Sequence, residues 1–158
     1  YRPEAIAKAI AMVRQGGIHV MGNYIFGLPD DDRASMRLTL DFAKELNTEF
    51  ANFFSAMAYP GSQLYRDALA RGWPLPQRWS GYSQHSKDCL PLPTRHLSGP
   101  EVLAFRDAAF LEYFDRDAYR GMVHRTFGDA ALADVTRMVA QPLPRAHAGV
   151  APVPEPAR

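Results

Sequence analysis

Helical and strand-like patterns alternate through the first half of this chain, and this alternation limits the fold more than any other feature. Apolar residues repeat at helical spacing over residues 3–15, and a run rich in β-branched and aromatic residues follows at 18–26. A second pair follows, with a helix over 32–46 and an apolar run over 50–58. Strands that alternate with helices predict α/β units with a parallel sheet.

Two predicted strands are too few for a complete parallel sheet. The apolar faces of the first two helices consist of Ile6, Ala9, Ile10 and Val13, and of Met36, Leu40, Ala43 and Leu46. A third helix follows Ser62 and closes at Gly72, with Leu64, Ala68 and Leu69 as its apolar residues. Parallel sheets are normally buried on both faces. We therefore expect other residues of the same protein, or a partner, to complete the sheet.

The second half of the chain has a different organisation. Residues 73–97 contain four prolines and two tryptophans and predict a long ordered loop. Residues 98–140 predict a helical extension, which opens with a capping box at Ser98 and Glu101 and carries a core of Phe105, Phe110 and Phe114. A helix within this extension is expected to stop at Gly128. Residues 141–158 are rich in proline without periodicity and predict a disordered tail.

Composition narrows the class of protein. The 158 residues carry 18 Lys and Arg against 17 Asp and Glu, and this near balance argues against a nucleic-acid-binding domain. No apolar run approaches the roughly 20 residues that span a bilayer. Cys89 is the single cysteine, which excludes a disulfide scaffold and favours a reducing, cytoplasmic location. One thiol also cannot by itself hold a zinc or iron–sulfur site.

A motif pair carries the functional hypothesis. The run Gly-Asn-Tyr-Ile-Phe-Gly-Leu-Pro at 22–29 is followed by acidic residues and a helix, and then by Tyr-Pro-Gly-Ser at 59–62 with Leu-Tyr at 64–65. Residues 1 to about 140 thereby resemble the C-terminal part of radical SAM enzymes, most closely those with an N-terminal cobalamin-binding domain. The segments 82–86 and 90–107 are similar to the C-terminal extension of that subgroup.

Two departures from the family pattern are clear. The C-x-x-x-C-x-x-C motif that defines the family is absent, so this chain with Cys89 alone cannot hold its iron–sulfur cluster. The acids at 30–32 stand where the family usually has Gly-Glu-Thr, which keeps an acid and a helix cap but loses the glycine. We therefore expect this chain by itself to be inactive.

The resemblance implies an α/β fold in which residues 1–72 form the last two strands and helices of a partial (β/α)6 barrel. It implies SAM and a 4Fe–4S cluster as cofactors, with the cluster ligands outside this chain, and cobalamin bound by a domain also outside it. The cluster would reduce SAM to give a 5′-deoxyadenosyl radical, and the cofactor would supply the difficult chemistry. Expected partners are the N-terminal part of the same protein and a small-molecule substrate.

The same resemblance assigns candidate site residues, with no metal ligand among them. The candidates on the SAM side are Gly22, Asn23, Ile25, Gly27 and Pro60, and those on the substrate side are Tyr82 and His85. A glycine allows close approach of the backbone to a flat ring, and an isoleucine offers an apolar surface for it. A histidine can transfer protons near neutral pH. These side chains would gather at the C-terminal ends of the barrel strands, where such sites form.

Simpler roles stand beside each assignment. Gly22 and Gly27 can be ordinary strand and turn glycines, and Ile25 plain core. The acids at 30–32 can cap a helix. His85 can be a surface or hydrogen-bonding residue, and Cys89 a buried small hydrophobe or a surface thiol. Arg106 and Asp107 are expected to form surface or interface ion pairs.

Three hypotheses for function remain open. The first is a radical SAM methyltransferase or cyclase. The second is a non-catalytic module that binds SAM or a nucleoside, or that docks to a partner. The third is part of an unrelated barrel hydrolase or aldolase that uses the acids at 30–32 as acids or metal ligands.

Overall fold

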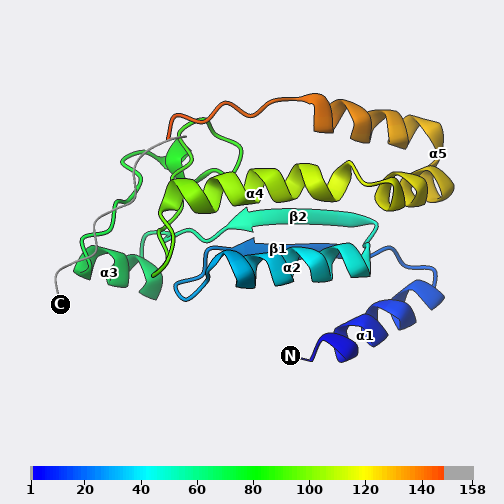
Figure 1. Cartoon of the computed structure of the whole chain (residues 1–158), viewed down its shortest axis with the longest axis horizontal. Helices are drawn as coiled ribbons and strands as arrows, with labels where there is room; N and C mark the ends of the chain where they lie inside the picture. Colours follow the sequence, from blue (N-terminus) through cyan, green and yellow to red (C-terminus); the bar gives the residue numbers. More distant parts are fainter. Residues whose placement is uncertain (1, 148–158) are drawn as a thin grey trace. The chain divides into compact units, whose positions relative to one another are not determined.

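The computed structural model describes residues 2–147 and confirms the predicted order of elements (Figure 1). The elements are α1 (Pro3–Gln15), β1 (Met21–Phe26), α2 (Arg33–Leu46), β2 (Phe50–Ser55), α3 (Gln63–Ala70), the short 3₁₀ helix η1 (Trp79–Tyr82), α4 (Gly99–Phe114) and α5 (Asp117–Ala140). The predicted long loop is therefore irregular apart from η1.

The two strands form a parallel pair. The Phe50 N–H donates to the Val20 carbonyl at 3.1 Å, and the Ala56 N–H donates to the Phe26 carbonyl at 2.7 Å. Both hydrogen bonds join residues 30 positions apart, so the register is constant along the pair. The described residues thus form a mixed α/β structure with two parallel strands.

The chain divides into two compact units. The first contains residues up to 24, 37–53 and 109–142. The second contains residues 25–36, 54–108 and those from 143 onward. Strands β1 and β2 and helices α2 and α4 each contribute residues to both units. The carboxyl ends of both strands belong to the second unit.

The first unit has an aromatic core under β2. The Phe53 ring lies 5.1 Å from the Tyr113 ring and 6.2 Å from the Phe114 ring, measured between centroids. The hydroxyls of Tyr113 and Tyr119 donate to the backbone carbonyls of Thr48 and Glu49, each at 3.1 Å. These bonds tie α4 and α5 to the entry of β2 while satisfying buried polar groups.

Helix α1 is joined to the same unit by polar contacts. The Arg14 guanidinium donates to the Glu49 carboxylate at 2.8 Å and to the carbonyls of Leu46 and Asn47 at 3.1 and 2.7 Å. No residue of α1 is buried, so its predicted apolar face is only partly covered. The inner face of α2 is buried as its spacing predicts, from Met36 to Leu46.

The second unit packs α4 against the end of β1. Val102 is fully buried, and the Phe26 and Phe105 rings meet edge to face with centroids 5.1 Å apart. The predicted capping box at the start of α4 is confirmed, because the Glu101 carboxylate accepts from the Ser98 N–H at 2.9 Å. The Ser98 hydroxyl in turn accepts from the Glu101 N–H at 3.4 Å.

Some predicted details are wrong. The strand predicted as buried over 18–26 begins at Met21, and its side chains alternate between covered and exposed positions. Ile25 is 49% exposed, because only one face of the strand is covered by helices. The predicted stop at Gly128 is confirmed, because this residue takes non-helical angles with a φ of +82°, and a second helical segment follows the kink within α5. Leu69, assigned to an apolar helix face, is largely exposed.

Candidate functional site

The candidate site lies in the second unit, at the carboxyl ends of β1 and β2. Ligands of parallel α/β folds bind at this end of the strands, because the loops that follow the strands converge there. The chain supplies two such segments, the turn after Gly27 and the turn around Tyr59 and Pro60, and the loop containing Tyr82 to His85 contacts the end of β2 through Gln84.

The turn after β1 is fixed by a carboxylate. Gly27 has a φ of +80°, and one oxygen of Asp31 accepts from the N–H groups of Gly27 and Leu28 at 3.0 and 2.9 Å. A Cβ at Gly27 would stand 2.4 Å from a methyl group of Val102. Both the backbone conformation and the approach of α4 therefore require glycine here.

The neighbouring acids confirm the capping role. Asp32 accepts from the Ser35 N–H at 2.8 Å at the start of α2, and this backbone hydrogen bond lowers the pKa of the Asp32 carboxyl. Asp30 pairs with Arg95 at 2.9 Å on the surface. Among residues 2–147, no group of three or more His, Cys, Asp or Glu side chains is placed to hold a metal ion.

Gln84 clamps the end of β2, a contact that the sequence analysis missed. Its side-chain amide oxygen accepts from the Ser55 N–H at 2.9 Å, and its amide nitrogen donates to the Ser55 carbonyl at 3.0 Å. Both residues are buried. The clamp holds the loop that carries Tyr82 and His85 against the strand end. In the sequence, the only indication that this loop packs against the rest of the chain is the presence of aromatic residues near it.

Three aromatic rings stack beside the turn after β2. The Tyr82 ring lies 5.7 Å from the Tyr59 ring, with the planes 26° apart, and 5.7 Å from the Trp79 ring. Tyr82 is buried between its neighbours, and burial raises the pKa of its hydroxyl. Trp79 is 75% exposed and Tyr59 is 51% exposed. The stack therefore presents aromatic surface to solvent at the edge of the site.

His85 lies near a charged cluster that joins the chain end to α4. Arg145 binds both oxygens of the Asp107 carboxylate at 2.8 and 2.7 Å, and Arg106 binds the same carboxylate at 2.9 Å. The pKa of His85 is lowered by partial burial and by the positive charges of Arg106 and Arg145. His85 itself is exposed, so it can reach solvent or a ligand.

The structure tests the predictions made for Arg106 and for Cys89. Arg106, expected in a surface or interface ion pair, is only 2% exposed, whereas the side chain of its partner Asp107 is 26% exposed, so the pair is half-buried. Cys89 is fully buried, and burial raises the pKa of its thiol. Of the two alternatives given for Cys89, a buried small hydrophobe or a surface thiol, the structure therefore shows the first. Residues 141–147, assigned above to a disordered tail, have a defined course through Arg145, while 148–158 lie outside the described residues.

The seven candidate residues fall into both units. Ile25, Gly27, Pro60, Tyr82 and His85 belong to the second unit, while Gly22 and Asn23 belong to the first. Gly22 points to the covered face of β1, since a Cβ there would stand 2.7 Å from the Tyr24 hydroxyl and 2.8 Å from the Thr48 hydroxyl.

Asn23 lies on the exposed face of β1 and accepts from the Asn52 amide at 2.9 Å. Ile25 is on the same face of the strand, two residues further on, whereas Pro60 is exposed in the turn after β2. Within residues 2–147, no helix has the length and apolar character needed to cross a membrane.

Comparison with known proteins gives two similar sequences, and no family model matches the chain. An uncharacterized methyltransferase, PH0819, of Pyrococcus horikoshii is 26% identical over 114 residues, which are 72% of this chain and 24% of that protein. The cytidylyl-2-hydroxyethylphosphonate methyltransferase of Streptomyces wedmorensis is 30% identical over 80 residues, or 47% of this chain and 15% of that protein. Both relatives are thus named methyltransferases, and the chain spans a quarter of their length or less.

Proposed function

We propose that this chain is the C-terminal part of a radical SAM methyltransferase, and that the strand ends in its second unit contact SAM and a small substrate. The observation that carries the proposal is that both similar proteins are named methyltransferases. The motif at 22–29, with its resemblance to radical SAM barrels, specifies the class of methyltransferase.

The exposed side of β1 fits the adenine of SAM. Ile25 presents an apolar side chain that is 49% exposed, at a strand end where ligands of such folds bind. Asp31 holds the Gly27 and Leu28 amides in a fixed turn beside it. A rigid turn with an adjacent apolar surface can orient a flat ring without ordering cost on binding.

The substrate side of the proposed site is formed by the loop after η1. Gln84 fixes this loop to Ser55, and His85 follows it directly. With its pKa lowered, His85 is neutral at pH 7 and can accept a proton from a substrate group. Tyr59 and Tyr82 supply aromatic surface against which a substrate can pack.

The residues of this chain do not fit a 4Fe–4S cluster. Cys89 is its single cysteine and is fully buried, whereas such clusters are held by several thiolates. We therefore assign cluster binding to other residues of the longer protein and derive no step through it here. Cobalamin is proposed as a further cofactor of that protein on the resemblance alone.

The first experiment measures SAM binding by the chain, using calorimetry. Ile25→Ala removes about two to three methylene equivalents of apolar contact and is expected to weaken SAM binding about 15–60-fold. Leu38→Ala, at an aliphatic residue of α2 that is 71% exposed, is the matched control and should leave binding unchanged. Equal binding by wild type and Ile25→Ala would exclude the proposed adenine contact.

The second experiment tests the class of enzyme. The coding sequence upstream of Tyr1 is expected to continue in frame and to encode C-x-x-x-C-x-x-C. If the triplet is lacking, the catalytic proposal fails. The alternative is then a module that binds SAM or a nucleoside, or docks to a partner, without a cluster.

A further inference from the structure

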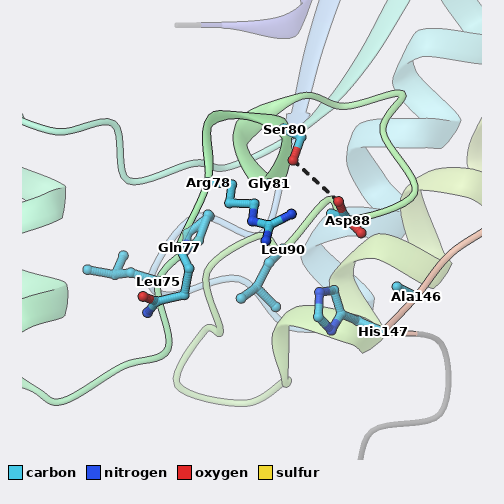
Figure 2. Close-up of a pocket in the computed structure, with 10 residues that line it drawn as sticks. Leu75, Gln77, Arg78, Ser80, Gly81, Asp88, Leu90, Ala146 and His147 are labelled. Atoms are coloured by element: carbon cyan, nitrogen blue, oxygen red, sulfur yellow. Dashed lines mark hydrogen bonds between the residues drawn. The ribbon is translucent and has the colours of Figure 1, made fainter.

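A pocket of about 280 Å³ lies in the second unit, apart from the strand ends (Figure 2). Its walls come from the loop before and after η1 and from the segment that follows α5. The lining residues are Leu75, Pro76, Gln77, Arg78, Ser80, Gly81, Asp88, Leu90, Ala146 and His147. The pocket is therefore lined by residues other than those of the strand-end site, although Ser80 and Gly81 belong to the same 3₁₀ helix as Tyr82.

The wall formed by the chain end is held in place by specific contacts. The Ala146 N–H donates to the Lys87 carbonyl at 2.8 Å. The adjacent Arg145, whose side chain is only 7% exposed, donates to the Ser86 carbonyl at 2.8 Å as well as to Asp107. These bonds dock the segment after α5 on the loop and so give the pocket a defined shape.

The opposite wall is tightly packed. A Cβ at Gly81 would stand 2.5 Å from the Pro76 ring, and the Leu90 N–H donates to the Gly81 carbonyl at 3.0 Å. Together with Leu75, these residues form an apolar surface on one side of the pocket. A ligand there would contact a preformed surface, which lowers the cost of binding.

Two opposite charges line this pocket without pairing. Figure 2 shows the Arg78 side chain extending across the pocket toward the side where Asp88 and His147 lie. Arg78 is an exposed residue, and in the part of the chain that the structure describes it makes no ion pair within 4.0 Å. Among residues 2–147, the Asp88 carboxylate accepts only from the Ser80 hydroxyl, at 3.3 Å. A guanidinium and a carboxylate thus face one small space and keep their capacity for a charged ligand.

We propose that this pocket binds a small zwitterion, an α-amino acid with an apolar side chain. Arg78 would bind the α-carboxylate, since its guanidinium can donate two parallel hydrogen bonds. Asp88 and Ser80 would accept from the α-ammonium, and the apolar side chain would lie on Leu75 and Leu90. The volume of about 280 Å³, just below the usual 300 Å³ or more of pockets for larger ligands, suits a ligand of this size.

The two charges of the ligand should make the pocket selective for a zwitterion. A zwitterion can pair with both Arg78 and Asp88. A simple anion can pair with Arg78 but not with Asp88, and a simple cation can pair with Asp88 but not with Arg78. Each singly charged analogue can form only one of the two charge-assisted contacts, so both analogues should bind more weakly than the zwitterion. The proposal does not depend on methyl transfer, and its ligand site shares no residue with the SAM contacts.

The test titrates the full chain with L-leucine, isovalerate and isoamylamine, and follows binding by NMR. Leucine is expected to bind, and each singly charged analogue to bind at least about tenfold more weakly. Arg78→Gln and Asp88→Asn should each weaken leucine binding by a similar factor. Arg78→Lys, which keeps the charge but loses the forked geometry, should fall between wild type and Arg78→Gln.

Matched controls separate the pocket from general charge effects. Arg125→Gln and Glu45→Gln change exposed residues of the first unit and should bind leucine as wild type does. Isovalerate binding as tight as that of leucine, or unchanged leucine binding by Asp88→Asn, would show an anion site and overturn the proposal. Absence of leucine binding up to about 10 mM would overturn it as well. Equal SAM binding by wild type and Ile25→Ala, which would refute the adenine contact, leaves this result unaffected, so the two proposals fail separately.

Discussion

Replacing Gly27 by alanine should destabilise the chain through two separable effects. The φ of +80° disfavours any residue with a Cβ by about 1–2 kcal/mol. The new Cβ would also stand 2.4 Å from one Val102 methyl group and 3.1 Å from the other. Overpacking of a close core contact typically costs about 1–3 kcal/mol. We therefore expect Gly27→Ala to lower the free energy of unfolding by about 2–5 kcal/mol.

Gly72→Ala isolates the backbone contribution. Gly72 has a φ of +64°, but a Cβ there would meet no atom within 4 Å, so this variant should lose only about 1–2 kcal/mol. Urea unfolding followed by circular dichroism measures both variants. In a double-mutant cycle, Val102→Ala should recover part of the loss caused by Gly27→Ala, because it removes both clashing methyl groups. Equal losses for Gly27→Ala and Gly72→Ala, together with additivity in the cycle, would refute the packing argument.

Three further expectations concern charges. Arg145→Met should lower the free energy of unfolding, measured in urea, by about 2–3 kcal/mol. This is below the usual loss of about 3–5 kcal/mol for a broken buried ion pair, because Asp107 is partly exposed to solvent and keeps its hydrogen bond to Arg106. The variant should also make residues 141–147 accessible to limited proteolysis. The pKa of His85 in the folded chain lies below 6.5, so the unfolded chain takes up a proton there more readily than the folded chain. The free energy of unfolding should therefore fall as the pH drops below about 6.5. His85→Gln should make this pH dependence weaker. Burial raises the pKa of Glu49, but hydrogen bonds from the Val20 N–H and from Arg14 hold this pKa below 4.5. The stability that Glu49 contributes above about pH 4.5 should therefore be lost as the pH falls. Glu49→Gln should remove this pH dependence, and an unchanged acid unfolding profile of the variant would contradict the expectation.

Local patterns in the sequence predicted the elements well. The spacing of Met36, Leu40, Ala43 and Leu46 marks the buried face of α2, and Ser98 with Glu101 marks the start of α4. In α1, by contrast, equally regular spacing accompanies no buried residue. Periodicity tells which side chains share a helix face, but the burial of that face depends on segments far away in the sequence.

Long-range contacts explain what the sequence did not predict. The burial of Arg106 was not predicted, because Asp107, which accepts from Arg106, also accepts from Arg145, 38 positions further along the chain. Gln84 is a polar loop residue by sequence, and only the fold brings it against Ser55. The candidate residues Ile25, Gly27, Pro60, Tyr82 and His85 share one unit, but alternation along β1 turns Gly22 to the opposite side from Ile25.

The Gln84 side chain substitutes for one residue of a neighbouring strand. Each residue of a strand directs its N–H and carbonyl to the same side, so Ser55 faces away from β1 while Ala56 bonds to Phe26. An unpaired strand edge can recruit another strand, and the amide of Gln84 occupies that edge at its last position. Any strand added next to β2 must therefore end before Ser55, whereas β1 has no such stop at its outer edge among the described residues. A strand that pairs with β1 at its outer edge would therefore meet no such block among the described residues.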